Sequence, residues 1–231
     1  MRVLAIAVAA AALLAGCSND ETVKSKAQVI ADARHARDSA SSYLVNGVFG
    51  PTADKWISVH LWVSAGNGEA GSMSTNLLTP HVTRHGGSFD VRVIGTDLYL
   101  RGDLAKIPRR HGSPPPPKGI WLKASTTSGP VARLYALIAP AKLFPILDSD
   151  PTTLTDRGWD TMGDNNPDNH AEVIVDAKDG GEMRVRAHGT PYPDSMTWDD
   201  EGNELEFSNW NAPVPISPPK GAVPASRYGL G

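Results

Sequence analysis

The stretch WISVHLWV, residues 56–63, decides the fold because its apolar side chains occupy every second position. Ile57, Val59 and Leu61 fall on one side of an extended chain, and Ser58 lies between the first two. Successive side chains of a β-strand point to opposite faces, so this period of two predicts a strand with one buried face and one face toward water.

The same alternation recurs along the chain between turns rich in glycine, such as 66–68. Parallel sheets are buried on both faces and show continuous apolar runs, so the alternation favours an antiparallel sheet of about eight to eleven strands. The predicted strands cover residues 43–49, 56–63, 69–76, 89–93, 98–100, 120–124, 173–175, 183–187 and 205–207, with a further edge strand at 214–216.

Two segments have the helical period instead. Residues 23–41 are rich in alanine, lack proline and glycine, and predict one helix. Residues 131–148 carry an apolar stripe that Pro140 and Pro145 interrupt, which predicts two short helices meeting near Ala139. The apolar face of the sheet needs a cover, and these helices are the candidates. We therefore expect an α+β fold, in which a large curved antiparallel sheet forms a half-barrel that encloses an N-terminal helix and a mid-chain helical pair.

The N-terminus has the pattern of an exported lipoprotein. Arg2 precedes an apolar run that ends in Leu14-Ala15-Gly16-Cys17, and small residues before a cysteine resemble the lipobox of bacterial lipoproteins. This resemblance implies cleavage before Cys17 and a lipid on its sulfur; the alternative is an ordinary secreted protein. The apolar run is shorter than the roughly 20 residues that span a bilayer. We expect a protein that is lipid-anchored on the extracytoplasmic face of the cell membrane.

These features divide the chain into four parts. Residues 1–16 are the expected signal peptide, 17–22 a lipidated tether, 23–217 a single domain, and 218–231 a flexible tail. The chain has 231 residues, and a hydrophobic content of 40% indicates a folded domain.

Charge and cysteine content exclude several functions. The chain carries 22 Lys and Arg against 25 Asp and Glu, a net charge of −3, and has no basic stripe of the kind that binds nucleic acid. Cys17 is its only cysteine, which excludes disulfides within the chain, thiol catalysis in the mature domain and cysteine-ligated metals.

Three segments resemble one family of bacterial lipoproteins. Residues 91–102, with Trp121-Leu122-Lys123 after them, resemble its middle hairpin; 184–193 resemble its strand leading into a Gly-x-Pro-Tyr-Pro turn; and 205–216 resemble its last strand. The family is the LolA-like group, specifically the LppX/LprG-type lipoproteins of actinobacterial-type cells. The resemblance implies a half-barrel with an apolar cavity that carries acyl chains of lipids or lipidated glycans, with no cofactor and no catalysed reaction.

The sheet also predicts an apolar groove on physical grounds, because so broad a face exceeds what short helices can fill. The candidate lining residues are Ile57, Val59, Leu61, Phe89, Val91, Leu98, Leu100, Leu122, Val173 and Val185 on the sheet, faced by Leu134, Leu137, Ile138 and Phe144. The alternative is that these residues pack on one another. The same fold would then act on an envelope protein as an interaction or sensor module through its loops at 106–118 and 149–169. In either case we expect a monomer.

Other chemistry has weaker support in the sequence. His81 and His85 have the i, i+4 spacing of helical zinc ligands, but they precede a strand and have no evident third ligand, so we interpret them as surface residues. The aspartates between residues 148 and 168 do not fit the calcium-binding EF-hand pattern. The chain has no Gly-x-Ser-x-Gly elbow of a hydrolase, and we expect no enzyme and no metal site. The tryptophans of the solvent face, at 56, 62 and 121, suit a sugar or membrane interface, or equally the rim of the barrel.

Overall fold

The protein is described from a computed structural model. The described residues are 25–52, 55–66, 68–75, 87–104, 107, 109–139, 143–150, 154–160, 172–177, 181–186, 189–197 and 203–231. The proposed signal peptide, tether and Cys17 lie outside these ranges, as do His81, His85 and most of loop 149–169.

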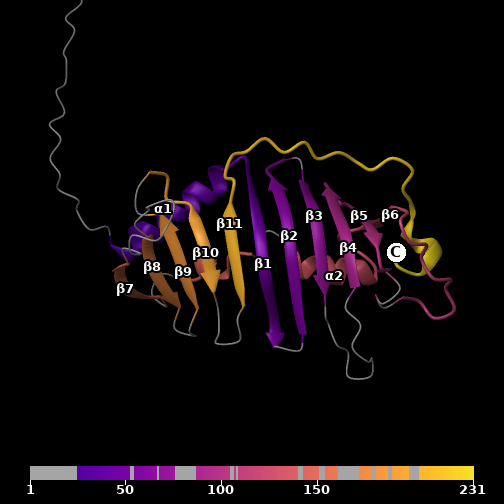
Figure 1. Cartoon of the computed structure of the whole chain (residues 1–231), viewed down its shortest axis with the longest axis horizontal. Helices are drawn as coiled ribbons and strands as arrows, with labels where there is room; N and C mark the ends of the chain where they lie inside the picture. The colour runs from indigo at the N-terminus through magenta and orange to yellow at the C-terminus, as the bar shows by residue number, and fades with distance from the viewer. Residues whose placement is uncertain are drawn as a thin grey trace, which may run out of the picture.

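In the described part of the chain, twelve strands form one sheet, seen face-on in Figure 1, in the order β12-β6-β5-β4-β3-β2-β1-β11-β10-β9-β8-β7. All neighbours pair antiparallel except β12, which pairs parallel with β6. The sheet is curved and unclosed, so the predicted α+β half-barrel is confirmed. The strands are β1 (Ser42–Thr52), β2 (Lys55–Ser64), β3 (Gly68–Thr75), β4 (Gly87–Ile94), β5 (Asp97–Gly102), β6 (Leu122–Ser125), β7 (Leu154–Asp160), β8 (Glu172–Ala177), β9 (Glu182–Arg186), β10 (Pro193–Thr197), β11 (Glu204–Ser208) and β12 (Val223–Pro224).

The order of strands follows from pairing between consecutive strands, with two long-range joins, β1 with β11 and β6 with β12. β1 to β6 run as a meander on one side, and β7 to β11 run back toward the middle on the other. β1 and β11 then pair, with Val45 opposite Phe207. Residues far apart in the sequence therefore meet at the centre of the sheet.

The register brings the alternating apolar residues onto one face, which we call the covered face because the helices pack on it. Val45 lies opposite Leu61, and Val91 lies opposite Leu100, which in turn lies opposite Leu122. All of these side chains are buried in one hydrophobic cluster. The other face, which we call the solvent face, presents exposed polar residues such as His60, Ser72 and Glu206.

Two glycines on the covered face allow neighbouring strands to approach closely. A Cβ on Gly71 would lie 2.0 Å from the carbonyl oxygen of His60 in β2. Gly47 has φ +151°, and a Cβ there would lie 2.1 Å from the carbonyl oxygen of Glu204 in β11. Only glycine fits at these positions, where it permits strong local bending of the sheet.

Among the described residues, three α-helices lie against the covered face. α1 (Lys26–Ser39) begins with a capping box, in which the side chains of Ser25 and Gln28 each bond to the other's backbone N–H. α2 (Pro130–Ile138) begins with a proline at its first turn and ends before Ala139, which is extended. α3 (Pro145–Asp148) is a single turn. The predicted pair of short helices is thus confirmed, but they do not meet near Ala139, because α2 ends at Ile138 and α3 begins at Pro145.

The core lies between these helices and the sheet. Val29, Ile30 and Ala33 of α1, Val131 and Ile138 of α2, and Leu147 of α3 belong to the same buried cluster as the covered face. Each buried aliphatic side chain of this kind contributes roughly 1.5–3 kcal/mol relative to its exposed state, so burial in this cluster is the main source of stability in a chain without disulfides.

The structure corrects three expectations. A strand, β7, runs through the predicted loop 149–169. The predicted edge strand at 214–216 is absent, because residues 212–219 have no regular structure. The predicted flexible tail at 218–231 instead forms β12 and a 3₁₀ turn, η4 (Ala225–Tyr228), and buries Ala225 and Leu230.

The segment from β11 to β12 follows one end of the strands across half of the sheet (Figure 1). Asn211 fixes its start: its backbone N–H donates to the carbonyl of Ser42 at 2.8 Å, and its Oδ1 accepts from the N–H of Ser41 at 2.7 Å. Further along, the guanidinium of Arg92 donates to the carbonyl of Ser217 at 2.9 Å. This return path brings β12 beside β6.

Candidate functional site

The candidate site is the covered face itself. Most of the predicted lining residues are buried there in one cluster: Ile57, Val59, Leu61, Phe89, Val91, Leu98, Leu100, Leu122, Ile138, Phe144 and Val185. Leu134 is partly buried and packs against that cluster. Leu137 lies in α2 and Val173 in β8, and their side chains are outside the described set. The structure therefore brings these residues together, and their role in binding a ligand stays a prediction.

An aromatic cluster, formed by Tyr43, Phe144, Tyr192, Phe207 and Trp210, stands where β1 meets β11. The ring of Phe144, just before α3, stacks on Phe207 with 4.4 Å between centroids. Trp210 stacks on Tyr192 at 4.5 Å, and the edge of Tyr43 meets Phe144 at 5.6 Å. These contacts position α3 over the middle of the covered face. Only Phe144 was expected from the sequence, because the others come together through the long-range β1–β11 pairing.

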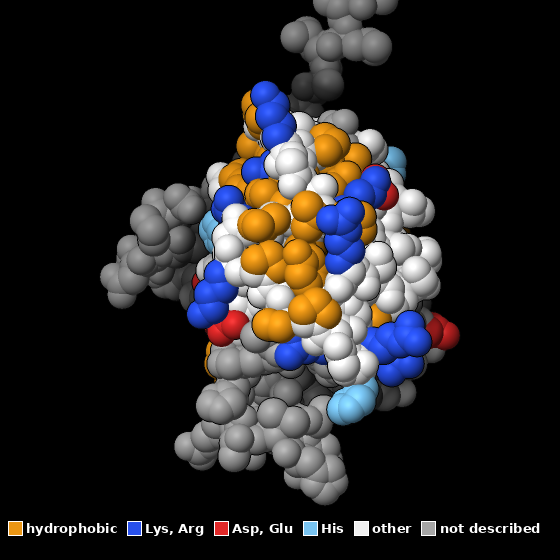
Figure 2. All heavy atoms as spheres, turned by 90° about the vertical axis from the view of Figure 1, so that its right-hand side faces the viewer, with side chains coloured by type: hydrophobic (Ala, Val, Ile, Leu, Met, Phe, Trp, Pro, Cys, Tyr) orange, Lys and Arg blue, Asp and Glu red, His pale blue; other side chains and the backbone are white. Residues whose placement is uncertain are grey.

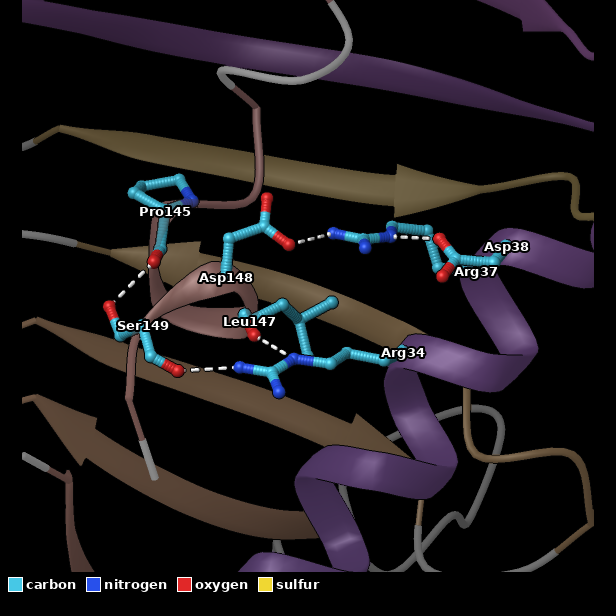
Figure 3. A network of polar contacts seen from close by, with 7 residues as sticks. All are labelled: Arg34, Arg37, Asp38, Pro145, Leu147, Asp148 and Ser149. Carbon is cyan, nitrogen blue, oxygen red and sulfur yellow. Dashed lines mark hydrogen bonds and ion pairs between the residues drawn. The ribbon is translucent and has the colours of Figure 1, made fainter. Parts of the chain in front are cut away.

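Two arginines of α1 hold α3 in place, as Figure 3 shows. Arg34 donates to the backbone carbonyls of Leu147 and Ser149, the latter at 2.5 Å. Arg37 forms an ion pair with Asp148 at 2.8 Å, and its guanidinium lies 5.2 Å from the centroid of the Phe144 ring. The carbonyls at the end of a helix have no partners within that helix, so Arg34 satisfies groups that would otherwise be left unpaired.

A buried carboxyl group interrupts the apolar covered face. Glu69 of β3 lies opposite Val63 on one side and Val93 on the other, and its side chain is only 5% exposed. The hydroxyl of Tyr135, on α2, donates to Glu69 Oε1 at 2.7 Å. Glu69 Oε2 is buried and has no hydrogen-bond partner among the described residues.

Burial raises the pKa of Glu69 to about 7, although the hydrogen bond from Tyr135 acts in the opposite direction. Burial also raises the pKa of Tyr135 and of Tyr43, and the nearby Glu69 carboxylate adds to both shifts. Glu69 was not expected from the sequence. The available signal was its position in β3, an even number of residues before Gly71 and Met73, which places it on the covered face.

The solvent face carries a different cluster. Trp121 is half-buried, and the guanidinium groups of Arg92 and Arg101 lie 5.1 and 4.7 Å from its ring centroid. Arg101 also pairs with Asp90. These contacts account for the packing of Trp121 without a ligand, by cation–π attraction. Trp56 and Trp62 are likewise half-buried on this face.

The end of the sheet formed by β6 and β12 presents both apolar and basic side chains on its surface. Figure 2 shows apolar side chains gathered on this end, with Lys and Arg around them. In the segments that form it, Ile120 is 41% exposed, and Lys118, Lys220 and Arg227 are also exposed. Large exposed apolar side chains beside charged ones occur at sites of protein contact.

The described residues include neither a cluster of metal ligands nor a membrane-spanning helix. No group of three or more His, Cys, Asp or Glu side chains in these ranges is arranged to hold a metal ion. None of the helices in the same ranges has the length and apolar content needed to cross a bilayer.

The fold and the covered face together define an unclosed half-barrel with a long apolar inner surface, on which Glu69 and Tyr135 form a buried polar pair. No protein-family model matches the chain, and no curated protein matches it in sequence. Among solved structures, the chain is similar to the crystal structure of the Mycobacterium tuberculosis lipoprotein LppX, with a TM-score of 0.49 and 14% identity. The match covers 84% of this chain and 100% of that one. Because the TM-score and the identity are both low, the class of fold rests on the sheet topology described above.

Proposed function

We propose that the protein is a membrane-anchored extracytoplasmic lipoprotein, which binds the acyl chains of a lipid or lipidated glycan against the covered face and carries or presents it at the cell envelope. The observation that carries this proposal is the extent of the apolar face. The buried apolar side chains run from Val175 in β8 to Leu122 in β6, and α1, α2 and α3 are the described helices over them. Such a face suits acyl chains, which need no directional bonds.

The position of α3 supports the same proposal. α3 is a single turn, and its described polar ties to the rest of the protein come from Arg34 and Arg37 of α1. Phe144, Ile146 and Leu147 are also buried in the cluster, so movement of α3 would expose apolar side chains that an acyl chain could cover in turn. Movement of α3 would give an acyl chain access to the interior near Phe144 and Phe207.

The first test is native mass spectrometry of the mature domain, truncated after Cys17 and purified from a lipid-containing host, followed by organic extraction. We expect a lipid bound in a defined molar ratio. The variant Val91→Phe adds volume on the covered face and should reduce the bound fraction, whereas Ser72→Phe, on the exposed solvent side of β3, should leave it unchanged. A folded domain with a clean unliganded mass, and no uptake of added phospholipid or lipoglycan, would contradict the proposal.

A second candidate function has one observation in its favour. The mixed apolar and basic end shown in Figure 2 suits contact with an envelope protein, in which case the filled core would be purely structural. The same mass measurement separates the two candidates, because the interaction module is expected to carry no lipid.

A further inference from the structure

We propose that Glu69 and Tyr135 form a polar site inside the covered face, which binds a hydrogen-bond donor, a hydroxyl or an amide N–H, on an otherwise apolar long-chain ligand. This inference rests on the proposed function, since it concerns the polar part of a ligand whose chains lie on that face.

The geometry leaves one acceptor of Glu69 available. Tyr135 donates to Oε1, and Oε2 is buried without a partner in the described part of the chain. The cross-strand neighbours on either side, Val63 and Val93, offer no hydrogen bonds from their side chains. Backbone groups of a strand are used by its own ladder, so the described residues offer no donor for Oε2, and a ligand can supply one.

An unpaired buried carboxylate oxygen is strongly unfavourable, and a ligand that supplies a donor removes that penalty. When Glu69 is ionised, at a pH above its pKa of about 7, a ligand with only ether or ester oxygens supplies acceptors and leaves Oε2 unpaired. The site therefore favours long-chain alcohols and amides over their fully alkylated or esterified counterparts. A ligand carboxylate is disfavoured as well, because two like charges would be buried together.

The test uses two probes that differ in one hydrogen-bond donor, octadecanol and octadecyl methyl ether. The full chain carrying Cys17→Ser, which removes the proposed site of covalent lipid, is incubated with an equimolar mixture of both at pH 9, where the Glu69 carboxyl is ionised. Protein is separated by gel filtration, and the bound probes are extracted and quantified by mass spectrometry. We expect the wild-type site to retain octadecanol in about tenfold excess, the ratio typical of one hydrogen bond to a charged group.

Substitutions test whether the preference for octadecanol over the ether arises from Glu69. Glu69→Gln has nearly the same shape but places an amide donor where Oε2 stands, and should bring the ratio close to one. Tyr135→Phe keeps the carboxyl group and should retain the preference for the alcohol. Glu206→Gln is the matched control, since it changes an exposed glutamate on the solvent face of the same sheet and should leave the ratio unchanged.

The outcomes separate this inference from the proposed function. Binding of both probes in equal amounts would overturn the inference, with water as the natural partner of Oε2, and would leave lipid binding intact. A preference that survives in Glu69→Gln would also overturn it. If neither probe binds to the folded protein, the proposed function and the inference both fail.

Discussion

Tyr135 and Glu69 are 66 residues apart in the sequence, and the 2.7 Å hydrogen bond between them joins helix α2 to strand β3 inside the core. A carboxyl group therefore forms a polar contact between this helix and the sheet that it covers. Because that carboxyl group is buried, its ionisation is coupled to folding.

The stability of the protein should consequently depend on pH through Glu69. The pKa of its carboxyl group is 4.5 without the protein environment and about 7 in the fold, so the folded state holds the proton more tightly. Below pH 4.5 the carboxyl is neutral in both states and burial costs least. As pH rises from 4.5 to about 7, the unfolded state ionises first and stability falls by at most about 3 kcal/mol, then stays level.

Glu69→Gln should remove this dependence. Urea denaturation at pH 4.5, 6 and 8 would show a variant whose free energy of unfolding falls less than that of the wild type between pH 4.5 and 8. Glu206→Gln, on the solvent face, should follow the wild-type curve. Parallel curves for the wild type and Glu69→Gln would show that Glu69 is not the responsible group.

Arg34→Ala should destabilise the contact between α1 and α3. It leaves the carbonyls of Leu147 and Ser149 without their donor, and hydrogen bonds to a charged group contribute a few kcal/mol together. We expect a loss of about 2 kcal/mol in urea denaturation, with His35→Ala, an exposed residue of the same helix, as the control. Equal stability of the two variants would indicate that α3 is held by its apolar contacts alone.

Leu230→Ala should destabilise the whole domain, although it lies one residue from the end of the chain. Leu230 is fully buried and belongs to the central cluster, so its truncation leaves a cavity and should cost about 3 kcal/mol. Arg227→Ala, exposed on η4, is the control. A change near zero in thermal or urea unfolding would show that the end of the chain is not part of the cooperative core.

Cys17→Ser should move the protein from the membrane fraction to the soluble extracytoplasmic fraction. Two or more acyl chains hold a protein on a bilayer almost irreversibly, and the substitution removes the sulfur that would carry them. Fractionation of cells that express each form, followed by immunoblotting, measures the change. Retention of the variant in the membrane fraction would contradict the anchor.

The main features of the fold could be predicted because they are local. The alternation in β2, with Ile57, Val59 and Leu61, survives in the structure as one buried face. The break at Ala139 follows directly from Pro140, and the capped α1 follows from its composition. Each of these signals lies within one element.

The features that were missed depend on burial set by distant segments. Leu230 is buried only because the chain returns along the sheet and places β12 beside β6. The 3₁₀ turn η4 and two-residue β12 are too short to show a period. β7 was missed because Asp156 and Asp160 gave it the composition of a loop. Glu69 was missed as a site residue because a charged residue in an exposed-looking strand is usually solvated.

The central position of β1 has a consequence for the order of assembly. On one side of β1, Leu44 pairs with Trp62 of β2, which is close in the sequence. On the other side it pairs with Ser208 of β11, which is more than 160 residues away. A chain that emerges N-terminus first can build the meander from β1 to β6 early, while the middle strand keeps an unpaired edge until β11 arrives. Such an edge invites pairing with other chains, and long-range closure is slow. The edge of β1 therefore stays open to pairing with another chain until β11 is in place.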